Sequence, residues 1–91
     1  MYEIKPTSRF MRDLKSIQRR GYDLRLLTAV IQTLAAGEPL AEKHKDHALS
    51  GVWSKHRECY VTPDWLLIYK LEKDILILTL TRTGTHSDLF G

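Results

Sequence analysis

The sequence predicts an α+β domain with the order β-α-α-β-β-β, in which two N-terminal helices pack on a mostly antiparallel sheet. Apolar residues recur at helical spacing in the first 37 residues, and short β-branched apolar runs fill the second half. The 91 residues are enough for one hydrophobic core. No internal repeat interrupts them, so we expect residues 1–91 to form a single domain.

The first elements are a short strand and an amphipathic helix. Residues 2–5 alternate before Pro6, which predicts a strand near a sheet edge. Thr7 or Ser8 can cap a helix over residues 8–20. Its apolar residues fall within an arc of about 120°. They are Phe10, Met11, Leu14 and Ile17.

A second helix is expected between Asp23, a candidate cap, and Gly37, which precedes Pro39. Its apolar residues also share one side: Leu24, Leu26, Leu27, Val30, Ile31 and Leu34. The link between the helices is short, which predicts an antiparallel helical hairpin. Both apolar faces then cover the sheet.

The rest of the sheet comes from the second half of the chain. Residues 40–50 lack periodicity and are rich in charge, so we expect an exposed loop. A β segment is predicted at about 52–61, and Pro63 interrupts it. Two more strands, at 65–71 and 75–81, are joined by a charged linker and predict a hairpin. A turn at 83–85 and a single helical turn or tail at 86–90 complete the chain.

The composition of the chain indicates its cellular compartment. Hydrophobic residues make up 43% and charged residues 27%, as in globular proteins. No apolar run approaches the roughly 20 residues that cross a bilayer, and the N-terminus has no hydrophobic signal region. The single Cys59 cannot form an internal disulfide, which fits a reducing compartment. We therefore expect a cytoplasmic protein with no membrane partner.

Positive charge is concentrated near the N-terminus. The net charge is +3, but residues 5–25 hold seven Lys or Arg against Asp13 and Asp23. Five of the seven would share the outer face of the first helix: Arg9, Arg12, Lys15, Arg19 and Arg20. This segment is either a nucleic-acid contact or an ordinary solvated helix face.

Residues suited to acid–base chemistry lie at the strand ends. Asp64 precedes one strand of the hairpin and His86 follows the other, so strand pairing places them at the same end of the sheet. His47 can approach from the preceding loop. Two imidazoles, a carboxylate and Arg82 suit cleavage of a phosphodiester. The alternative is that these are ordinary turn and surface residues.

Two further groups have both a functional and a structural interpretation. Trp65 and Phe90 could stack RNA bases, or they could fill the core and plug the sheet edge. A metal site is a third hypothesis, although the spacing of its ligands matches no closed zinc pattern. Those ligands would be His44, His47, His56 and Cys59. No Gly-rich phosphate loop, CxxC pair or nucleophile elbow is present.

Four stretches resemble the YafQ branch of the RelE/ParE superfamily, toxins of type II toxin–antitoxin modules. They are KDHALSG (45–51), RECYV (57–61), PDWLLIY (63–69) and RTGTHSDLF (82–90). The N-terminal half matches only as a β-α-α pattern with a basic first helix. The resemblance implies a microbial-ribonuclease-like fold and a ribosome-associated mRNA endonuclease that uses no metal or other cofactor. Its product would carry a 2′,3′-cyclic phosphate or a 3′-phosphate.

The resemblance also assigns roles to individual residues. His47 and His86 would form the proton-transfer pair, with acid and base left unassigned. Asp64 would orient a histidine or the substrate, and Arg82 would hold the phosphate. The expected substrate contacts are Trp65, Phe90, Tyr60 and Lys45.

Tyr60 departs from the family pattern, which has a histidine at this position. A tyrosine hydroxyl can donate a hydrogen bond, but it is a poor base at neutral pH. His56, an even strand offset away, is an open candidate for the missing role. The departure gives weight to an alternative in which the chain is a non-catalytic binding module or a gyrase-targeting, ParE-like toxin.

The resemblance implies a protein partner as well. It would be an antitoxin with a ribbon-helix-helix DNA-binding end and a segment that wraps the toxin. The basic first helix is a candidate surface for that segment or for ribosomal RNA, while mRNA and the ribosome are the expected targets.

Overall fold

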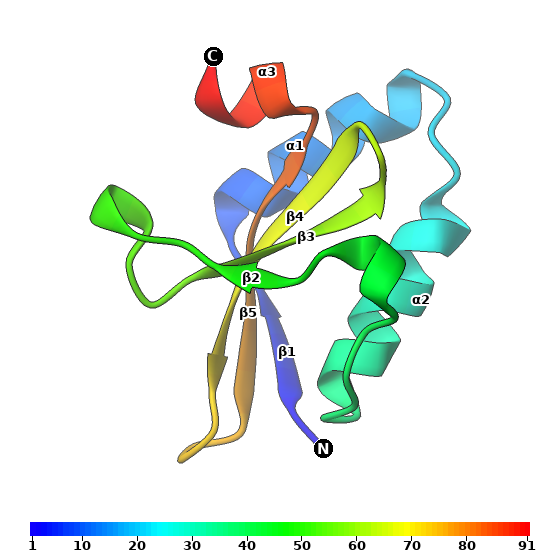
Figure 1. Cartoon of the computed structure of the whole chain (residues 1–91). Coiled ribbons are helices and arrows are strands. Elements are labelled where there is room, and N and C mark those ends of the chain that lie inside the picture. Colours follow the sequence, from blue (N-terminus) through cyan, green and yellow to red (C-terminus); the bar gives the residue numbers. More distant parts are fainter.

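The computed structural model describes all 91 residues and confirms the predicted fold class. Five strands form one sheet in the order β1-β5-β4-β3-β2, and two helices cover one face (Figure 1). Strand β1 (Glu3–Pro6) is parallel to β5 (Ile77–Gly84), and every other pairing is antiparallel. No helix has the length and apolar character needed to cross a membrane.

The two long helices form where local signals predicted them. Helix α1 spans Ser8–Arg19, and the Thr7 side chain accepts a hydrogen bond from the Phe10 N–H. Helix α2 spans Leu24–Ala35, and the Asp23 side chain accepts one from the Arg25 N–H. Both caps satisfy backbone donors that a helix leaves free at its first turn.

The segment before the central strands differs from the prediction. Residues 40–50 contain a 3-10 turn, η1 (Glu42–His44), and a two-residue strand, β2 (His47–Ala48). Val52 lies in a second turn, η2 (Gly51–Trp53), and is 95% exposed. The prediction of a strand over 52–61 was therefore wrong in its first half. Gly51 and Lys55 both have a positive φ, which bends the chain before β3 begins.

The last three strands and the C-terminal helix follow in sequence. Strands β3 (Arg57–Thr62) and β4 (Trp65–Glu72) are antiparallel, and helix α3 spans His86–Phe90. The predicted turn at 83–85 was misplaced, because β5 continues to Gly84 and pairs there with Leu66. Because β5 is longer than predicted, α3 lies at the end of the sheet (Figure 1).

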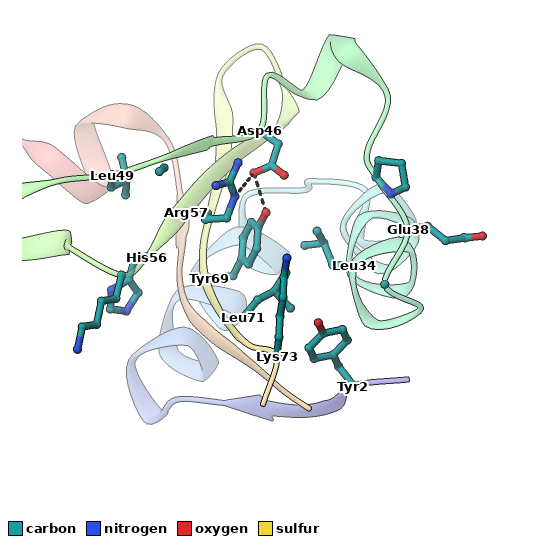
Figure 2. A pocket seen from close by; sticks show the side chains of 14 residues that line it. Tyr2, Leu34, Glu38, Asp46, Leu49, His56, Arg57, Tyr69, Leu71 and Lys73 are labelled. Carbon is teal, nitrogen blue, oxygen red and sulfur yellow. Dashed lines mark hydrogen bonds and ion pairs between the residues drawn. The ribbon is translucent and has the colours of Figure 1, made fainter. Parts of the chain in front are cut away.

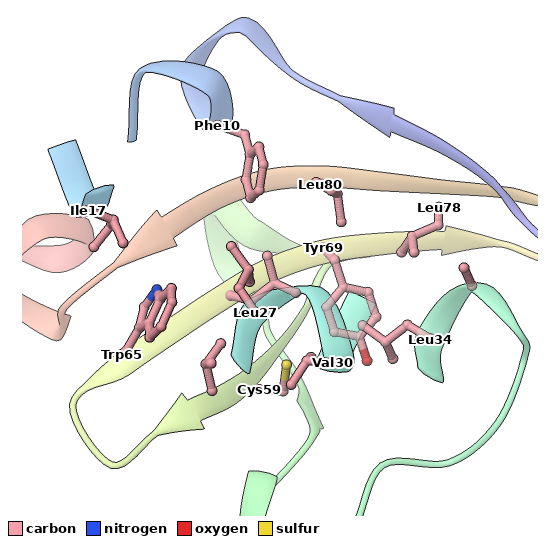
Figure 3. Packing of buried hydrophobic residues seen from close by; sticks show 13 residues of the cluster. Phe10, Ile17, Leu27, Val30, Leu34, Cys59, Trp65, Tyr69, Leu78 and Leu80 are labelled. Carbon is pink, nitrogen blue, oxygen red and sulfur yellow. The ribbon is translucent and has the colours of Figure 1, made fainter. Parts of the chain in front are cut away.

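Alternation along β4 separates two hydrophobic layers. Trp65, Leu67 and Tyr69 face α1 and α2 and belong to the main core (Figure 3). Leu66 and Ile68 point to the opposite face, where they pack with Leu89 of α3. The small α3 is thus the helix that packs on the second face.

Candidate active site

A pocket of about 430 Å³ opens between the β3–β4 turn and the start of α3. Its lining includes Asp64 from the turn and His86 from α3. The pairing of Leu66 with Gly84 brings these segments together, as the predicted hairpin requires. The prediction that Asp64 and His86 lie at the same end of the sheet is confirmed. The other lining residues are Tyr60, Pro63, Leu66, Thr85 and Ser87.

Helix α3 is fixed by a reciprocal cap. The Asp88 N–H donates to the Thr85 hydroxyl at 3.2 Å, and the Thr85 N–H donates to the Asp88 carboxylate at 2.8 Å. The Thr85 N–H, together with Arg20 at 2.9 Å, holds the pKa of the Asp88 carboxyl below its usual value. A Cβ at Gly84 would approach Asp88 to 2.9 Å, so only glycine fits before this cap.

His86 is left open to solvent by this arrangement. It is the first residue of α3, and its imidazole makes no hydrogen bond or ion pair with the rest of the chain. Its ring centroid lies 4.9 Å from that of Phe90, which is 40% exposed and packs edge-on against Trp53. The imidazole and the Phe90 ring therefore present one accessible surface beside the pocket.

His47 does not line that pocket but lies on β2, at the edge of the sheet. Its Nδ1 is 2.6 Å from the Lys45 carbonyl, and its Nε2 is 3.2 Å from a Glu58 carboxylate oxygen. Lys45 has a left-handed backbone, which turns its carbonyl toward the imidazole. Here Lys45 contributes its carbonyl to His47, and the substrate role of its ammonium group stays a prediction.

Asp46, beside His47, fixes the loop from the other side. Its carboxylate accepts hydrogen bonds from the Tyr69 hydroxyl at 2.6 Å and from Arg57 Nε at 3.2 Å (Figure 2). These groups line a cavity of about 650 Å³ near the C-terminal end of α2. Burial and the hydrogen bond to Asp46 raise the pKa of Tyr69. Asp46 therefore acts as the anchor of the loop that carries His47.

Glu58 is a site residue that sequence reasoning missed. Although charged, it is only 5% exposed, and it pairs with His47 across β2 and β3. Its second carboxylate oxygen is buried without a hydrogen-bond partner. The sequence signal for Glu58 was its place in the motif RECYV. Strand alternation there puts Glu58 on the same face of the sheet as Tyr60.

Arg82 is not placed as predicted. It lines a different hollow, where its Nε and Nη2 donate to the Asp13 carboxylate at 2.6 and 3.0 Å. Both side chains are 13% exposed, and these hydrogen bonds raise the pKa of Arg82. Asp13 also accepts from the Thr83 N–H at 3.1 Å. The guanidinium therefore ties α1 to β5 and is not free beside Asp64 and His86.

Replacing Asp13 with Asn should test this tie. The amide has one acceptor oxygen in place of two and no charge, so we expect a loss of about 1.5–3 kcal/mol in the free energy of unfolding. Urea unfolding would measure it. The exposed Asp74→Asn serves as the matched control and should change stability by less than about 0.5 kcal/mol. An Asp13→Asn protein as stable as this control would contradict the structural role.

Trp65 also corrects a prediction. It is 1% exposed, packs edge-on against Tyr22, and donates from Nε1 to the Thr83 hydroxyl at 2.9 Å. Figure 3 shows its ring within the main core. Trp65 therefore cannot stack an RNA base in this conformation, whereas the exposed ring of Phe90 can.

The remaining candidate site residues do not lie together in one site. His44 Nδ1 contacts the Tyr60 carbonyl at 2.5 Å, and His56 lines the large cavity instead of the pocket with Asp64 and His86. The position of His56 does not support its taking the role of the family histidine at Tyr60. Cys59 is fully buried, which raises the pKa of its thiol to about 12. No group of three or more His, Cys, Asp or Glu side chains is placed to hold a metal ion.

Comparisons with known proteins agree with this architecture. Residues 2–91 match the family described as bacterial toxin of type II toxin-antitoxin system, YafQ. The mRNA interferase toxin YafQ of Escherichia coli strain K12 is 39% identical over 90 residues, covering 98% of this chain and 96% of that protein.

Solved structures give the same result. A chain of the E. coli DinJ-YafQ complex superposes with a TM-score of 0.92 at 38% identity, and the match covers 100% of both chains. A metal-bound toxin from Helicobacter pylori also superposes with a TM-score of 0.92, at 44% identity. That match covers 99% of this chain and 100% of the H. pylori chain.

Proposed function

Because the chain belongs to the YafQ family of bacterial toxins of type II toxin–antitoxin systems, we propose that it is an endoribonuclease that cleaves mRNA. The observation that carries the proposal is the open pocket that Asp64 and His86 both line, with the Phe90 ring against His86. Asp64 belongs to the motif PDW and His86 to the motif GTH. The E. coli relative is named an mRNA interferase.

The proposed reaction is an attack within the RNA strand. The ribose 2′-oxygen bonds to phosphorus, its proton passes to a general base, and the bond from phosphorus to the 5′-oxygen breaks. A general acid protonates that oxygen. The products are a 2′,3′-cyclic phosphate and a 5′-hydroxyl. His86 and His47 are the proposed proton-transfer groups.

Other groups around the pocket would hold the RNA. The Phe90 ring offers a stacking surface, and the Tyr60 side chain lines the pocket. Asp64 accepts a hydrogen bond from the Thr62 hydroxyl at 3.2 Å and keeps acceptor capacity to orient a ribose hydroxyl. Arg82 is left out of the scheme, because Asp13 already accepts from two of its donors.

The partners we propose are a ribbon-helix-helix antitoxin and the translating ribosome in the cytoplasm. The E. coli relative is found in a toxin-antitoxin complex with DinJ, which supports an antitoxin partner for this chain. Four basic side chains on α1 are exposed and suit a phosphate backbone. They are Arg9, Arg12, Lys15 and Arg19. Arg20 is committed to Asp88.

Expression of the chain in a bacterial host tests the proposed activity. We expect translation to stop and primer extension on cellular mRNA to reveal new 5′ ends, whose 5′-hydroxyl groups accept phosphate from a polynucleotide kinase. Uncut message together with induction of DNA damage would favour a gyrase-targeting toxin. Uncut message without any growth defect would favour a non-catalytic binding module, to which Tyr60 lends weight.

A further inference from the structure

We infer that Trp53 is a positioning residue, which holds the Phe90 ring in the orientation that stacks an RNA base. The inference rests on the proposed ribonuclease function, in which Phe90 supplies the stacking surface. The contact that carries it joins the two rings edge-on, with centroids 6.5 Å apart and planes at 78°. Aromatic pairs in proteins favour this geometry.

Phe90 needs a support from outside its own helix. Helix α3 has five residues, whereas an isolated helix needs about 12–15 residues to form in water. The capping box fixes the first turn of α3, but only Gly91 follows Phe90 at the other end. The Phe90 ring is 40% exposed, and its aromatic neighbours are His86 and Trp53. Because the exposed His86 imidazole is not held by a hydrogen bond, the firmer of the two neighbours is Trp53.

Trp53 is held in place by both its backbone and its side chain. Its N–H donates to the Ser50 carbonyl at 3.2 Å, and its carbonyl accepts from the His56 N–H at 3.0 Å. The indole is half-buried and packs against the cluster of buried residues on the second face of the sheet. Trp53 therefore links Phe90 to the rigid part of the molecule.

The backbone around Trp53 is bent so that neighbouring side chains face in different directions. Gly51 and Lys55 both have a left-handed backbone, with φ of 67° and 68°, which is unfavourable for a lysine. Between them, Val52 is 95% exposed while Trp53 packs on the sheet. Within η2, Trp53 is thus the side chain that reaches α3, and Val52 offers a control on the same turn.

The support has a consequence for RNA binding. A side chain that is already ordered loses less conformational freedom when a ligand binds to it, so the ligand binds more tightly. Without Trp53, the Phe90 ring would have to be ordered at the moment when a base stacks on it. Trp53 therefore strengthens RNA binding through Phe90, and its own contact with RNA is not required.

A double-mutant cycle on RNA binding tests this inference. The ligand is a 2′-O-methyl oligoribonucleotide, which cannot be cleaved because its 2′-oxygens carry no proton. We expect Phe90→Ala to raise Kd by about tenfold, as for the loss of one stacked base, and Trp53→Ala by about threefold or more. The double variant should bind no more weakly than Phe90→Ala. Additive losses would overturn the inference, because Trp53 would then act without Phe90.

Two further variants separate positioning from folding. Trp53→Phe keeps an aromatic ring against Phe90 and should bind the oligonucleotide within about twofold of the parent. Val52→Ala should leave Kd unchanged, and circular dichroism would verify that each variant is folded. In cleavage assays Trp53→Ala should raise KM and change kcat by less than about twofold, since Phe90 transfers no proton. A Trp53→Phe protein that binds as weakly as Trp53→Ala would contradict the positioning role.

NMR of the RNA-free protein separates this inference from the proposed function. In the parent we expect nuclear Overhauser effects between the Trp53 indole and the Phe90 ring, a measurement that needs no variant to fold. In Trp53→Ala the backbone order parameter of Phe90 should fall to about 0.6 or lower. Absence of these effects in the parent, or unchanged order in the variant, would overturn the inference. A parent that shows both results but cuts no RNA would refute the proposed function and leave the support of Phe90 by Trp53 standing.

Discussion

Replacing His86 with alanine is expected to lower kcat for RNA cleavage by about 10²–10⁴-fold, the usual contribution of a general acid or base. The fold should survive, because the imidazole is exposed and hydrogen-bonds to nothing else in the chain. Thr85 and Asp88, which fix the start of α3, are untouched by the change. The loss would therefore report on chemistry.

Single-turnover cleavage of mRNA on programmed ribosomes would measure this effect, with circular dichroism to verify folding. The matched control is His56→Ala, which removes an imidazole that lines the other cavity. We expect the control to cleave at a rate within about threefold of the parent. A loss in His56→Ala as large as in His86→Ala would revive His56 as the replacement for the family histidine. His86→Ala cleaving as fast as the parent would exclude His86 from the reaction.

Features set by neighbouring residues could be predicted from the sequence. The caps at Thr7 and Asp23 were found because a cap bonds to backbone two or three residues away. The proximity of Asp64 and His86 also followed, since a hairpin fixes which residues meet at its open end. Each inference needed only local geometry or a single strand pairing.

Features that depend on distant contacts could not be predicted. Asp13 and Arg82 are 69 positions apart, and nothing in either segment indicates the other. Strand β2 has two residues, too few for any periodicity to show. Strand alternation failed at Thr81, which is an extra residue between the pairings of Arg82 with Ile68 and of Leu80 with Tyr69.

The extra residue in β5 also explains why the prediction that Trp65 stacks RNA bases was wrong. Unbroken alternation would turn Arg82 inward with Leu78 and Leu80, and Thr83 outward. The extra residue reverses the order after Thr81, so the Thr83 hydroxyl faces the core and accepts the Trp65 N–H. A buried tryptophan needs a hydrogen-bond acceptor for its indole N–H, and here the acceptor lies on another strand.

Replacing Trp65 with alanine is accordingly expected to lower the free energy of unfolding by about 3–5 kcal/mol, as for other large core aromatics. A domain has about 5–15 kcal/mol in total, so this loss is a large fraction of its stability. Urea unfolding followed by circular dichroism would measure the loss. Phe90→Ala removes an exposed aromatic ring, and we expect it to cost about 1 kcal/mol or less while raising KM for RNA.

Trp65→Phe separates packing from RNA contact. The smaller ring leaves part of the core unfilled, so stability should fall, by about 1–3 kcal/mol. The Thr83 hydroxyl keeps its own hydrogen bond to the Leu66 carbonyl at 2.8 Å, which limits the damage. Because the ring at position 65 does not reach solvent, KM for RNA should be unchanged in the folded fraction. A Trp65→Phe protein with parental stability and a raised KM would instead show that Trp65 leaves the core to bind RNA.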